Sequence, residues 1–431
     1  MSTEAIAILI LVGLFAVMTI CHLPVTFAMV ISTACTMLYL DIPMMTMVQQ
    51  MAKAVNSFSL LAIPFFILMG EIMGAGGISS RLLLFANALV GHLRGGLAHV
   101  NVLASMFFGG ISGSAVADVS SLGKIEIPMM EDAGYDKEFS VAVTVSSACQ
   151  GLLIPPSHNM VIYAMAAGGV SIGRLFLAGY VPGILLGLAL MILCYYFAVK
   201  RNYPKGDRVP VREVLKVTKD AFFAIFSMVI IVGGVVGGLF TATEAAAIGC
   251  IYSFIVAVLI YRELKIKMMP KLLYNSVKTL SMVYALIAAA GAFGWMLAYL
   301  RIPAKFTNLL LNVSDNKIVV FLLINLILLI LGCIMDMAPL VLIMTPILLP
   351  VVTKFGMDPI QFGIMLIMNL AIGLLTPPVG SCLYAGCAVG GTTIEKMTKV
   401  LLPFYAVMIV ALILITFVPA ISMTLPNLMM P

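Results

Sequence analysis

Charged residues are scarce in this sequence. Asp, Glu, Lys and Arg make up 10% of its 431 residues, whereas hydrophobic residues make up 62% and the mean hydropathy is +1.16. A soluble domain carries about 25% charged residues, so the composition excludes a soluble protein, and it excludes a disordered chain as well. The apolar runs are continuous instead of alternating with period two, which excludes a membrane β-barrel. The sequence therefore predicts an all-α integral membrane protein with about ten spans in a lipid bilayer.

Several motifs are missing. The eight cysteines lie in apolar stretches without a CxxC pair, so we interpret them as core residues and not as a metal or disulfide framework. No P-loop, HExxH or GxSxG motif occurs, which argues against ATP hydrolysis by this chain and against an enzyme. The net charge of +6 indicates loop topology and not a nucleic-acid partner. No Lys or Arg precedes Lys53, so the apolar run from Ala5 is expected to be a first span and not a signal peptide.

An internal repeat relates two parts of the chain. Residues 151–156 (GLLIPP) recur as 373–378 (GLLTPP), an offset of 222. At this offset, residues 110–174 and 332–396 share 15 identities in 65 positions. Glycines and prolines account for many of these identities, and their fixed spacing is not explained by apolar composition alone. The sequence therefore predicts a duplication.

Each half has the same predicted plan. The predicted spans are 5–20, 23–40, 58–76, 138–166 and 175–199, then 221–239, 244–261, 280–299, 360–388 and 400–419, with amphipathic segments at 41–57 and 263–279. The stretches 98–130 and 318–350 are longer. A straight helix of that length would reach about 50 Å across a core of about 30 Å, so a re-entrant hairpin fits each stretch better.

Five crossings per half would invert the second half relative to the first, which is the inverted-repeat plan of secondary transporters. The predicted domains are a first repeat at 1–199, a basic cytoplasmic linker at 200–219 and a second repeat at 220–431. Placing the linker in the cytoplasm puts 18 Lys and Arg residues inside and 6 outside, as the positive-inside rule requires. Both termini are then expected on the periplasmic side.

Each half also has a Pro-Pro pair inside an apolar span, at 155–156 and 377–378. Proline lacks an N–H and clashes with the carbonyl four residues earlier. The carbonyls that we expect to be released are those of Gly151, Leu152, Gly373 and Leu374. Free carbonyls in a bilayer cost several kcal/mol, and a dehydrated cation satisfies them because hard cations prefer oxygen ligands. A kinked helix completed by hydroxyls or water is the alternative.

The middle of the first predicted hairpin is rich in small polar residues. Ser112 and Ser114 offer hydroxyl oxygens, although the same small residues also suit close helix packing. The second tip, 332–339, has a different sequence, which indicates two non-identical sites. His158 follows the first Pro-Pro pair. Two roles remain open for this residue: contact with the solute and a hydrogen-bonded structural role.

Few carboxylates lie inside the predicted membrane segments, and each of them is a candidate functional residue. Asp118 and Asp336 lie near the hairpin tips and are expected to contact an ion or the solute, with bonding to backbone N–H groups as the alternative. Glu244 is expected to cap the helix that follows it. Glu71 is either paired or near an interface.

These features together resemble the large permease subunit of tripartite ATP-independent periplasmic (TRAP) transporters, the DctM and SiaM type. The matching stretches occur in order over nearly the whole chain, at 59–66, 112–118, 154–157, 238–245 and 373–380. The chain departs from the family pattern at Ala242, where proline is usual, and at His158 and Asn159, where many members are apolar. The second departure bears on the solute.

The resemblance implies an elevator-type, sodium-coupled importer of the bacterial inner membrane, with about two sodium ions and no organic cofactor. A soluble periplasmic binding protein (the P component) would deliver a small acidic solute, and a small membrane subunit (Q) would brace this chain. A sugar acid such as sialic acid is favoured, with four-carbon dicarboxylates next. Since no intramembrane Arg is evident, helix N-termini and hydroxyls would hold the carboxylate.

The resemblance also implies the site residues. The expected sodium ligands are Ser112, Ser114, Ala115, Gly151, Ile154 and Pro156 for one site, and Asp336, Met337, Gly373, Thr376 and Pro378 for the other. The expected solute contacts are Asp118, Ser157, His158, Asn159, Gly380 and Ser381. Two other functions remain open: a stand-alone sodium–carboxylate symporter of the divalent-anion type, and a passive channel or membrane scaffold.

Overall fold

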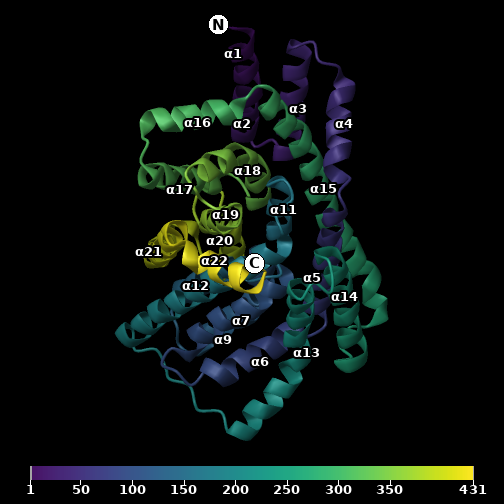
Figure 1. The fold of residues 1–431 in the computed structure, drawn as a ribbon. Coiled ribbons are helices and arrows are strands. Elements are labelled where there is room, and N and C mark those ends of the chain that lie inside the picture. Colours follow the sequence, from purple (N-terminus) through teal and green to yellow (C-terminus); the bar gives the residue numbers. More distant parts are fainter. Residues whose placement is uncertain (1, 431) are drawn as a thin grey trace.

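The structure is a computed structural model that describes residues 2–430, and helices dominate it (Figure 1). Within this region, nine helical segments are long and apolar enough to cross a membrane. They are Thr3–Ile20, Phe58–Ala75, Ile172–Lys200, Val211–Val236, Ala242–Ile260, Ile266–Tyr299, Lys317–Ile334, Met337–Lys354 and Ile394–Phe417. The prediction of an all-helical, multi-span membrane protein is therefore confirmed.

The first half comprises twelve α-helices. They are α1 (Thr3–Ile8), α2 (Leu14–Ile20), α3 (Val25–Tyr39), α4 (Met44–Val55), α5 (Ala62–Ala75), α6 (Ile78–Val90), α7 (Gly96–Ser112), α8 (Ala115–Ser121), α9 (Gly123–Asp132), α10 (Lys137–Gly151), α11 (His158–Ala166) and α12 (Ile172–Lys200). A π-helical turn, η1 (Leu9–Gly13), joins α1 to α2, and a 3-10 turn, η2 (Phe58–Leu61), precedes α5.

The second half comprises ten α-helices. They are α13 (Val211–Val236), α14 (Ala242–Ile255), α15 (Met269–Tyr299), α16 (Ile302–Val313), α17 (Lys317–Ile334), α18 (Met337–Lys354), α19 (Pro359–Gly373), α20 (Ser381–Gly390), α21 (Ile394–Phe417) and α22 (Pro419–Met429). Two short turns, η3 (Val256–Ile260) and η4 (Ile266–Met268), lie between α14 and α15.

Both long stretches are helix–turn–helix units, as predicted. In the first, α7 ends at Gly113, whose φ of +61° lies in the left-handed region that favours glycine. The second arm follows at once as α8 and α9. In the other unit, the turn between α17 and α18 consists of Met335 and Asp336, both in extended conformation. We call these units hairpin 1 (α7 to α9) and hairpin 2 (α17 and α18).

The spans with the Pro-Pro pairs are interrupted helices. The chain leaves helical conformation after α10 and resumes it at α11, and likewise between α19 and α20. Both Pro–Pro peptide bonds are cis. We call α10–α11 and α19–α20 the two broken helices.

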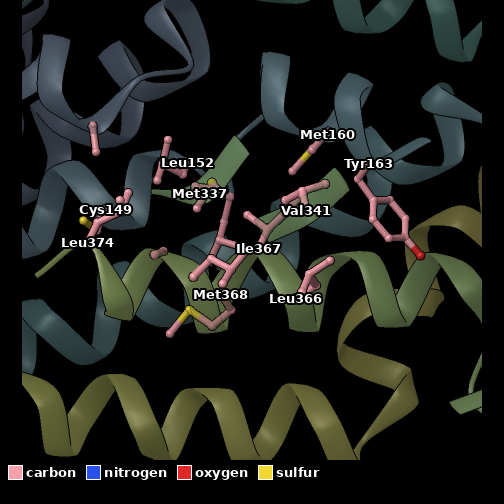
Figure 2. Close-up of a cluster of buried hydrophobic side chains, with 14 of the residues drawn as sticks. Cys149, Leu152, Met160, Tyr163, Met337, Val341, Leu366, Ile367, Met368 and Leu374 are labelled. Atoms are coloured by element: carbon pink, nitrogen blue, oxygen red, sulfur yellow. The ribbon is translucent and has the colours of Figure 1, made fainter. Parts of the chain in front are cut away.

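The two halves interlock in one apolar core (Figure 2). Side chains from the first broken helix, such as Met160, meet Val341 on hairpin 2 and Ile367 on the second broken helix, and all three are buried. The Tyr163 hydroxyl donates to the Pro359 carbonyl across the same interface. This shared core holds the two broken helices side by side, so that both breaks lie near the hairpin tips.

Three features differ from the predicted plan. Helix α13 begins at Val211, inside the predicted linker, because Pro210 precedes it and Glu213 suits a first helical turn. The predicted segment 263–279 is not a separate helix. Most of it belongs to α15, which continues for 31 residues, since nothing there resembles the Asn56–Ser57 break that separates α4 from α5. Helices α6, α16 and α22 were not predicted.

Candidate functional site

A cavity of about 410 Å³ lies where both hairpin tips meet both broken helices. The tips contribute Ser114, Ala115, Asp336 and Met337, and the broken helices contribute His158, Asn159 and Ser381. Helices α3 and α15 close the other side with Thr26 and Thr279, among others. The structure thus brings together seven of the residues that the sequence predicted for ion or solute contact.

A second cavity, of about 510 Å³, lies against hairpin 1. It shares Ser114, His158 and Thr279 with the first cavity, and it adds Ser112 and the carboxylate-bearing Glu71. No Lys or Arg is among the described residues that line the two cavities. The polar lining consists of hydroxyl, amide, imidazole and carboxylate groups.

The first cavity collects the N-terminal ends of helices. Helix α8 begins at Ala115, α18 at Met337, α11 at His158 and α20 at Ser381, and all four residues line this cavity. Free N–H groups and the helix macrodipole make an N-terminus favourable for an anion. At α20 the N–H groups of Cys382 and Leu383 already donate to the Leu374 carbonyl, so this end contributes mainly through the helix macrodipole. Together the four ends favour a negatively charged solute without a basic side chain.

At the second tip, hydrogen bonds tie hairpin 2 to the second broken helix. The Ser381 hydroxyl donates to Oδ1 of Asp336 at 3.1 Å. The Val379 N–H donates to the Cys333 carbonyl at 3.0 Å. Asp336 and Ser381 therefore lie next to each other in the cavity wall, although they are 45 residues apart in the sequence.

At the first tip, the turn is closed by serines. The Ser114 N–H donates to the Ser112 hydroxyl oxygen at 3.3 Å, and the Asn159 amide donates to the Gly113 carbonyl at 3.4 Å. A Cβ atom at Gly113 would lie 3.0 Å from Nδ1 of His158. The tip therefore packs directly on the start of α11, which places His158 and Asn159 beside Ser114.

The prediction that the Pro-Pro pairs leave carbonyls wholly free is wrong at three positions. The Gly151 carbonyl accepts from the Ile154 N–H at 3.1 Å, and the Gly373 carbonyl accepts from the Thr376 N–H at 2.9 Å. The Leu374 carbonyl accepts from two N–H groups at the start of α20, at 3.1 and 3.2 Å. The turns after the helix ends supply the first two donors, and α20 supplies the others. Because a carbonyl oxygen has two lone pairs, the Gly151 and Gly373 carbonyls can each still contact a cation, whereas both lone pairs of the Leu374 carbonyl are already used.

Glycines let the broken helices approach the hairpins closely. A Cβ atom on Gly151 would lie 2.9 Å from the Cα of Gly109, and one on Gly373 would lie 2.6 Å from the Cα of Gly332. Both contacts are backbone to backbone, so no side chain can move aside. The equivalent positions in the two halves therefore need glycine for packing, whether or not their carbonyls bind an ion.

Other predicted residues lie outside the two cavities. Asp118 is 1% exposed and Ser157 is 0% exposed, and neither lines a cavity. The other predicted residues outside both cavities are Gly151, Ile154, Pro156, Gly373, Thr376, Pro378 and Gly380. The Thr376 hydroxyl donates to the Ile372 carbonyl at 2.8 Å. The buried Asp118 therefore lies apart from the two cavities.

Two of the remaining carboxylates have defined partners. Glu244 forms a capping box with Thr241 at the start of α14, so that prediction is confirmed. Glu71 accepts from the Asn275 amide at 3.4 Å and faces the second cavity. The sequence reasoning missed Thr279, which lines both cavities. A single threonine in an amphipathic stretch carries no signal that distinguishes it from its neighbours.

The family model described as "Tripartite ATP-independent periplasmic transporter, DctM component" matches residues 12–421. The chain belongs to this family. It is 41% identical over 383 residues to the sialic acid TRAP transporter large permease protein SiaM of Vibrio cholerae, with 88% of this chain and 89% of SiaM covered. It is 42% identical over 370 residues to the C4-dicarboxylate TRAP transporter large permease protein DctM of Pseudomonas aeruginosa, with 86% of each covered. The predicted resemblance to TRAP large permeases is confirmed, and such a permease is a transporter and not an enzyme.

A third TRAP relative and a solved structure extend the comparison. The isethionate TRAP transporter permease protein DctMQ of Oleidesulfovibrio alaskensis is 38% identical over 418 residues, which cover 96% of this chain and 65% of DctMQ. The crystal structure of the Alcanivorax borkumensis YdaH transporter matches with a TM-score of 0.62 at 13% identity, covering 89% of this chain and 88% of YdaH. At this identity the likeness concerns the fold alone. The TRAP large permease therefore shares its helical architecture with another transporter.

Proposed function

We propose that this TRAP large permease imports a small acidic solute together with sodium ions, by an elevator movement of the hairpins and broken helices. The observation that carries the proposal is the cavity in which four helix N-termini converge, because it suits an anion at a place with no Lys or Arg among its described lining residues. The site lies between hairpins and broken helices of both repeats, where inverted-repeat transporters bind their cargo.

Two sodium sites would flank this cavity. The hydroxyls of Ser112 and Ser114 with the carbonyls after Gly151 would form one, and Asp336 with the Thr376 region would form the other. Hydroxyl, carbonyl and carboxylate oxygens are suitable donors for a hard cation, and both sets lie at a hairpin tip against a break. No group of three or more His, Cys, Asp or Glu able to hold a metal occurs in residues 2–430, which fits weakly held sodium better than a structural metal. Each cation moving inward contributes about 2.3 kcal/mol per 100 mV.

For the solute, we favour a sugar acid such as sialic acid, with four-carbon dicarboxylates next. SiaM and DctM, whose names specify these two solute classes, are almost equally similar to this chain, so similarity alone does not choose between them. His158 and Asn159 add polar groups to the cavity wall. A polyhydroxylated sugar acid uses such groups better than a compact dicarboxylate does.

A periplasmic binding protein and a small membrane subunit would complete the transporter. The family description names a tripartite, periplasmic system. The DctMQ relative is longer than this chain, which covers 65% of it, and its name combines M and Q. Both observations support a Q partner for this permease and a place in the bacterial inner membrane, with the termini expected on the periplasmic side.

The test is uptake by proteoliposomes that contain this chain and its small subunit. Radiolabelled sialic acid is supplied under an inward sodium gradient, with and without the binding protein. Uptake that needs both sodium and the binding protein supports the proposal. Uptake without the binding protein would indicate a stand-alone sodium–carboxylate symporter. Flux unaffected by sodium and by Ser112→Ala would indicate a passive channel. If sialic acid is not moved, a panel of sugar acids and dicarboxylates tests the solute class.

A further inference from the structure

The second arm of hairpin 1 carries a carboxylate that the proposed function does not use. Glu126, on α9, is 0% exposed, and neither carboxylate oxygen has a hydrogen-bond partner among the described residues. Glu126 lines neither cavity. Among the glutamates that the structure describes, only Glu126 is buried.

The helix geometry directs this side chain toward the interior of the protein. Leu122, between α8 and α9, keeps helical backbone angles (φ −68°, ψ −42°), so the arm continues as one helix. Residues 118 and 126 are eight positions apart, a little over two turns and about 12 Å along the axis, so both fall within the width of one helix face. Both side chains on this face are buried. The face packs against α7, α10 and α20.

The elements packed against this arm carry buried polar side chains, but among the described residues none of them forms an ion pair with the arm. On α7 and α10, Asn101 donates to Thr144 at 2.7 Å, and the Ser147 hydroxyl donates to Asn101 at 2.7 Å. The Ser105 hydroxyl donates to Ser147 at 3.2 Å. A hydroxyl has one proton to donate, and in this structure the Ser105 and Ser147 hydroxyls point to partners within the network and not to Glu126.

The remaining titratable groups facing this region can be named element by element. They are Asp118 on the arm itself, His99 on α7, Cys149 on α10 and Cys382 on α20, with Lys137 at the start of α10 beside Gly391, which ends α20. Within the described chain, no Lys, Arg or His forms an ion pair with Glu126 or Asp118. An unpaired buried carboxylate is costly while ionised, and it is relieved by taking up a proton.

We infer that Glu126 is a proton-binding site, and that the arm of hairpin 1 packs against α10 and α20 with this carboxyl group protonated. The step is simple proton uptake from water by the carboxylate, with no other reactant. Because the side chain is fully buried, proton exchange requires the arm to separate from its neighbours, so protonation and arm docking are linked. The inference rests on burial and packing and does not depend on sodium coupling or on the identity of the solute.

A cation in place of the proton is less suited to this position. The site would offer one or two carboxylates, and the hydroxyls beside Asp118 already bond to one another. No cluster of three or more His, Cys, Asp or Glu occurs in the described chain. A proton needs no further ligand, so it is the ligand that the geometry favours.

The first experiment measures thermal unfolding of the purified full chain between about pH 5 and pH 9. An unfolded glutamate ionises near pH 4.3, whereas folded Glu126 keeps its proton. The melting temperature of the wild type should therefore fall as pH rises over this range. Glu126→Gln, which mimics the protonated group, should lose a clear part of this slope. Asp132→Asn, an exposed residue at the end of the same helix, should keep the wild-type slope.

A second experiment keeps the inference testable even if Glu126→Gln does not fold. The wild-type chain is labelled with 13C-carboxyl glutamate, and its infrared spectrum is recorded at neutral pH. A protonated-carboxyl band that shifts with the label is expected, since Asp118 carries no label. Absence of such a band overturns the inference. So does a Glu126→Gln slope equal to that of the wild type, or a stabilisation by sodium alone that only the wild type shows.

Discussion

The hydroxyl of Ser381, at the first residue of α20, donates to the carboxylate of Asp336 at the tip of hairpin 2, over 3.1 Å. The bond joins α18 and α20, two of the four helices that begin at the first cavity. It also leaves the second carboxylate oxygen of Asp336 free to face the cavity. A cation held here would therefore couple the tip to the broken helix.

Replacing Asp336 tests this coupling. Asp336→Asn removes the negative charge, and a hydrogen bond or contact to a charged group is worth about 1.5–3 kcal/mol. We expect the sodium concentration for half-maximal uptake to rise about ten- to a hundredfold, and Ser381→Ala to raise it less. Asp315→Asn, an exposed residue outside the cavities, is the control. An unchanged sodium dependence of uptake in Asp336→Asn would mean that this residue does not belong to the proposed sodium site.

The glycine contacts give a second prediction. Gly151→Ala and Gly373→Ala each force a Cβ atom against backbone, at 2.9 Å and 2.6 Å from the facing Cα atoms of Gly109 and Gly332. Overpacking of this kind costs about 1–3 kcal/mol, so both variants should unfold at a lower temperature and transport less. The matched control is Gly233→Ala, a helical glycine with nothing within 4 Å of the added atom. If Gly373→Ala is as stable as the wild type, the backbone at this contact can move enough to accommodate the added Cβ atom.

Much of this site could be predicted from the sequence because prolines and glycines have local consequences. The Pro-Pro pairs interrupt any helix that contains them, and the 222-residue offset revealed that the interruption occurs twice. Ser114 and Asp336 correspond at the same offset, and both precede the first residue of a hairpin's second arm. The tips and breaks were therefore predicted as pairs before any three-dimensional arrangement was known.

The orientation of side chains could not be predicted in the same way. Asp118 lies four residues after Ser114, yet packing against α10 and α20 turns it away from the cavity that Ser114 lines. Thr279 lines both cavities because α15 is one continuous helix that runs along them. No local pattern in 263–279 predicts that the helix continues through this segment. These features depend on which distant helix packs on which face of each helix. The spacing of residues within one sequence does not contain that information.

A cluster at the start of α10 predicts a pH effect on stability. The Tyr203 hydroxyl donates to Asp136 at 2.7 Å and the Arg201 guanidinium donates to the same oxygen at 2.6 Å. Both contacts hold the pKa of Asp136 below its usual range, and burial raises the pKa of Tyr203 to about 12, so the hydroxyl remains a donor at neutral pH. The stabilisation is present above the unfolded pKa of about 3.9 and is lost as pH falls through the lower folded value.

Asp136→Asn should therefore melt at a lower temperature than the wild type at neutral pH and lose less stability in acid. The difference should stay at or below about 1 kcal/mol because the pair is largely exposed. Asp207→Asn, an exposed aspartate in the linker that also carries Arg201 and Tyr203, serves as the control and should follow the wild type throughout. Parallel pH profiles for Asp136→Asn and the wild type would show that the cluster does not stabilise the fold.

Thr279 supplies a prediction about the wall opposite the hairpins. Thr279 is the polar residue of α15 that lines both cavities, so in the proposed transport cycle its hydroxyl is placed to bond the solute. Thr279→Val keeps the shape and removes one hydrogen bond, worth about 0.5–1.5 kcal/mol. We expect KM for the solute to rise about two- to tenfold, with the maximal rate little changed. Thr353→Val, which removes a hydroxyl bonded only within α18, should leave both values at wild-type levels. An unchanged KM in Thr279→Val would mean that α15 closes the cavity by shape alone.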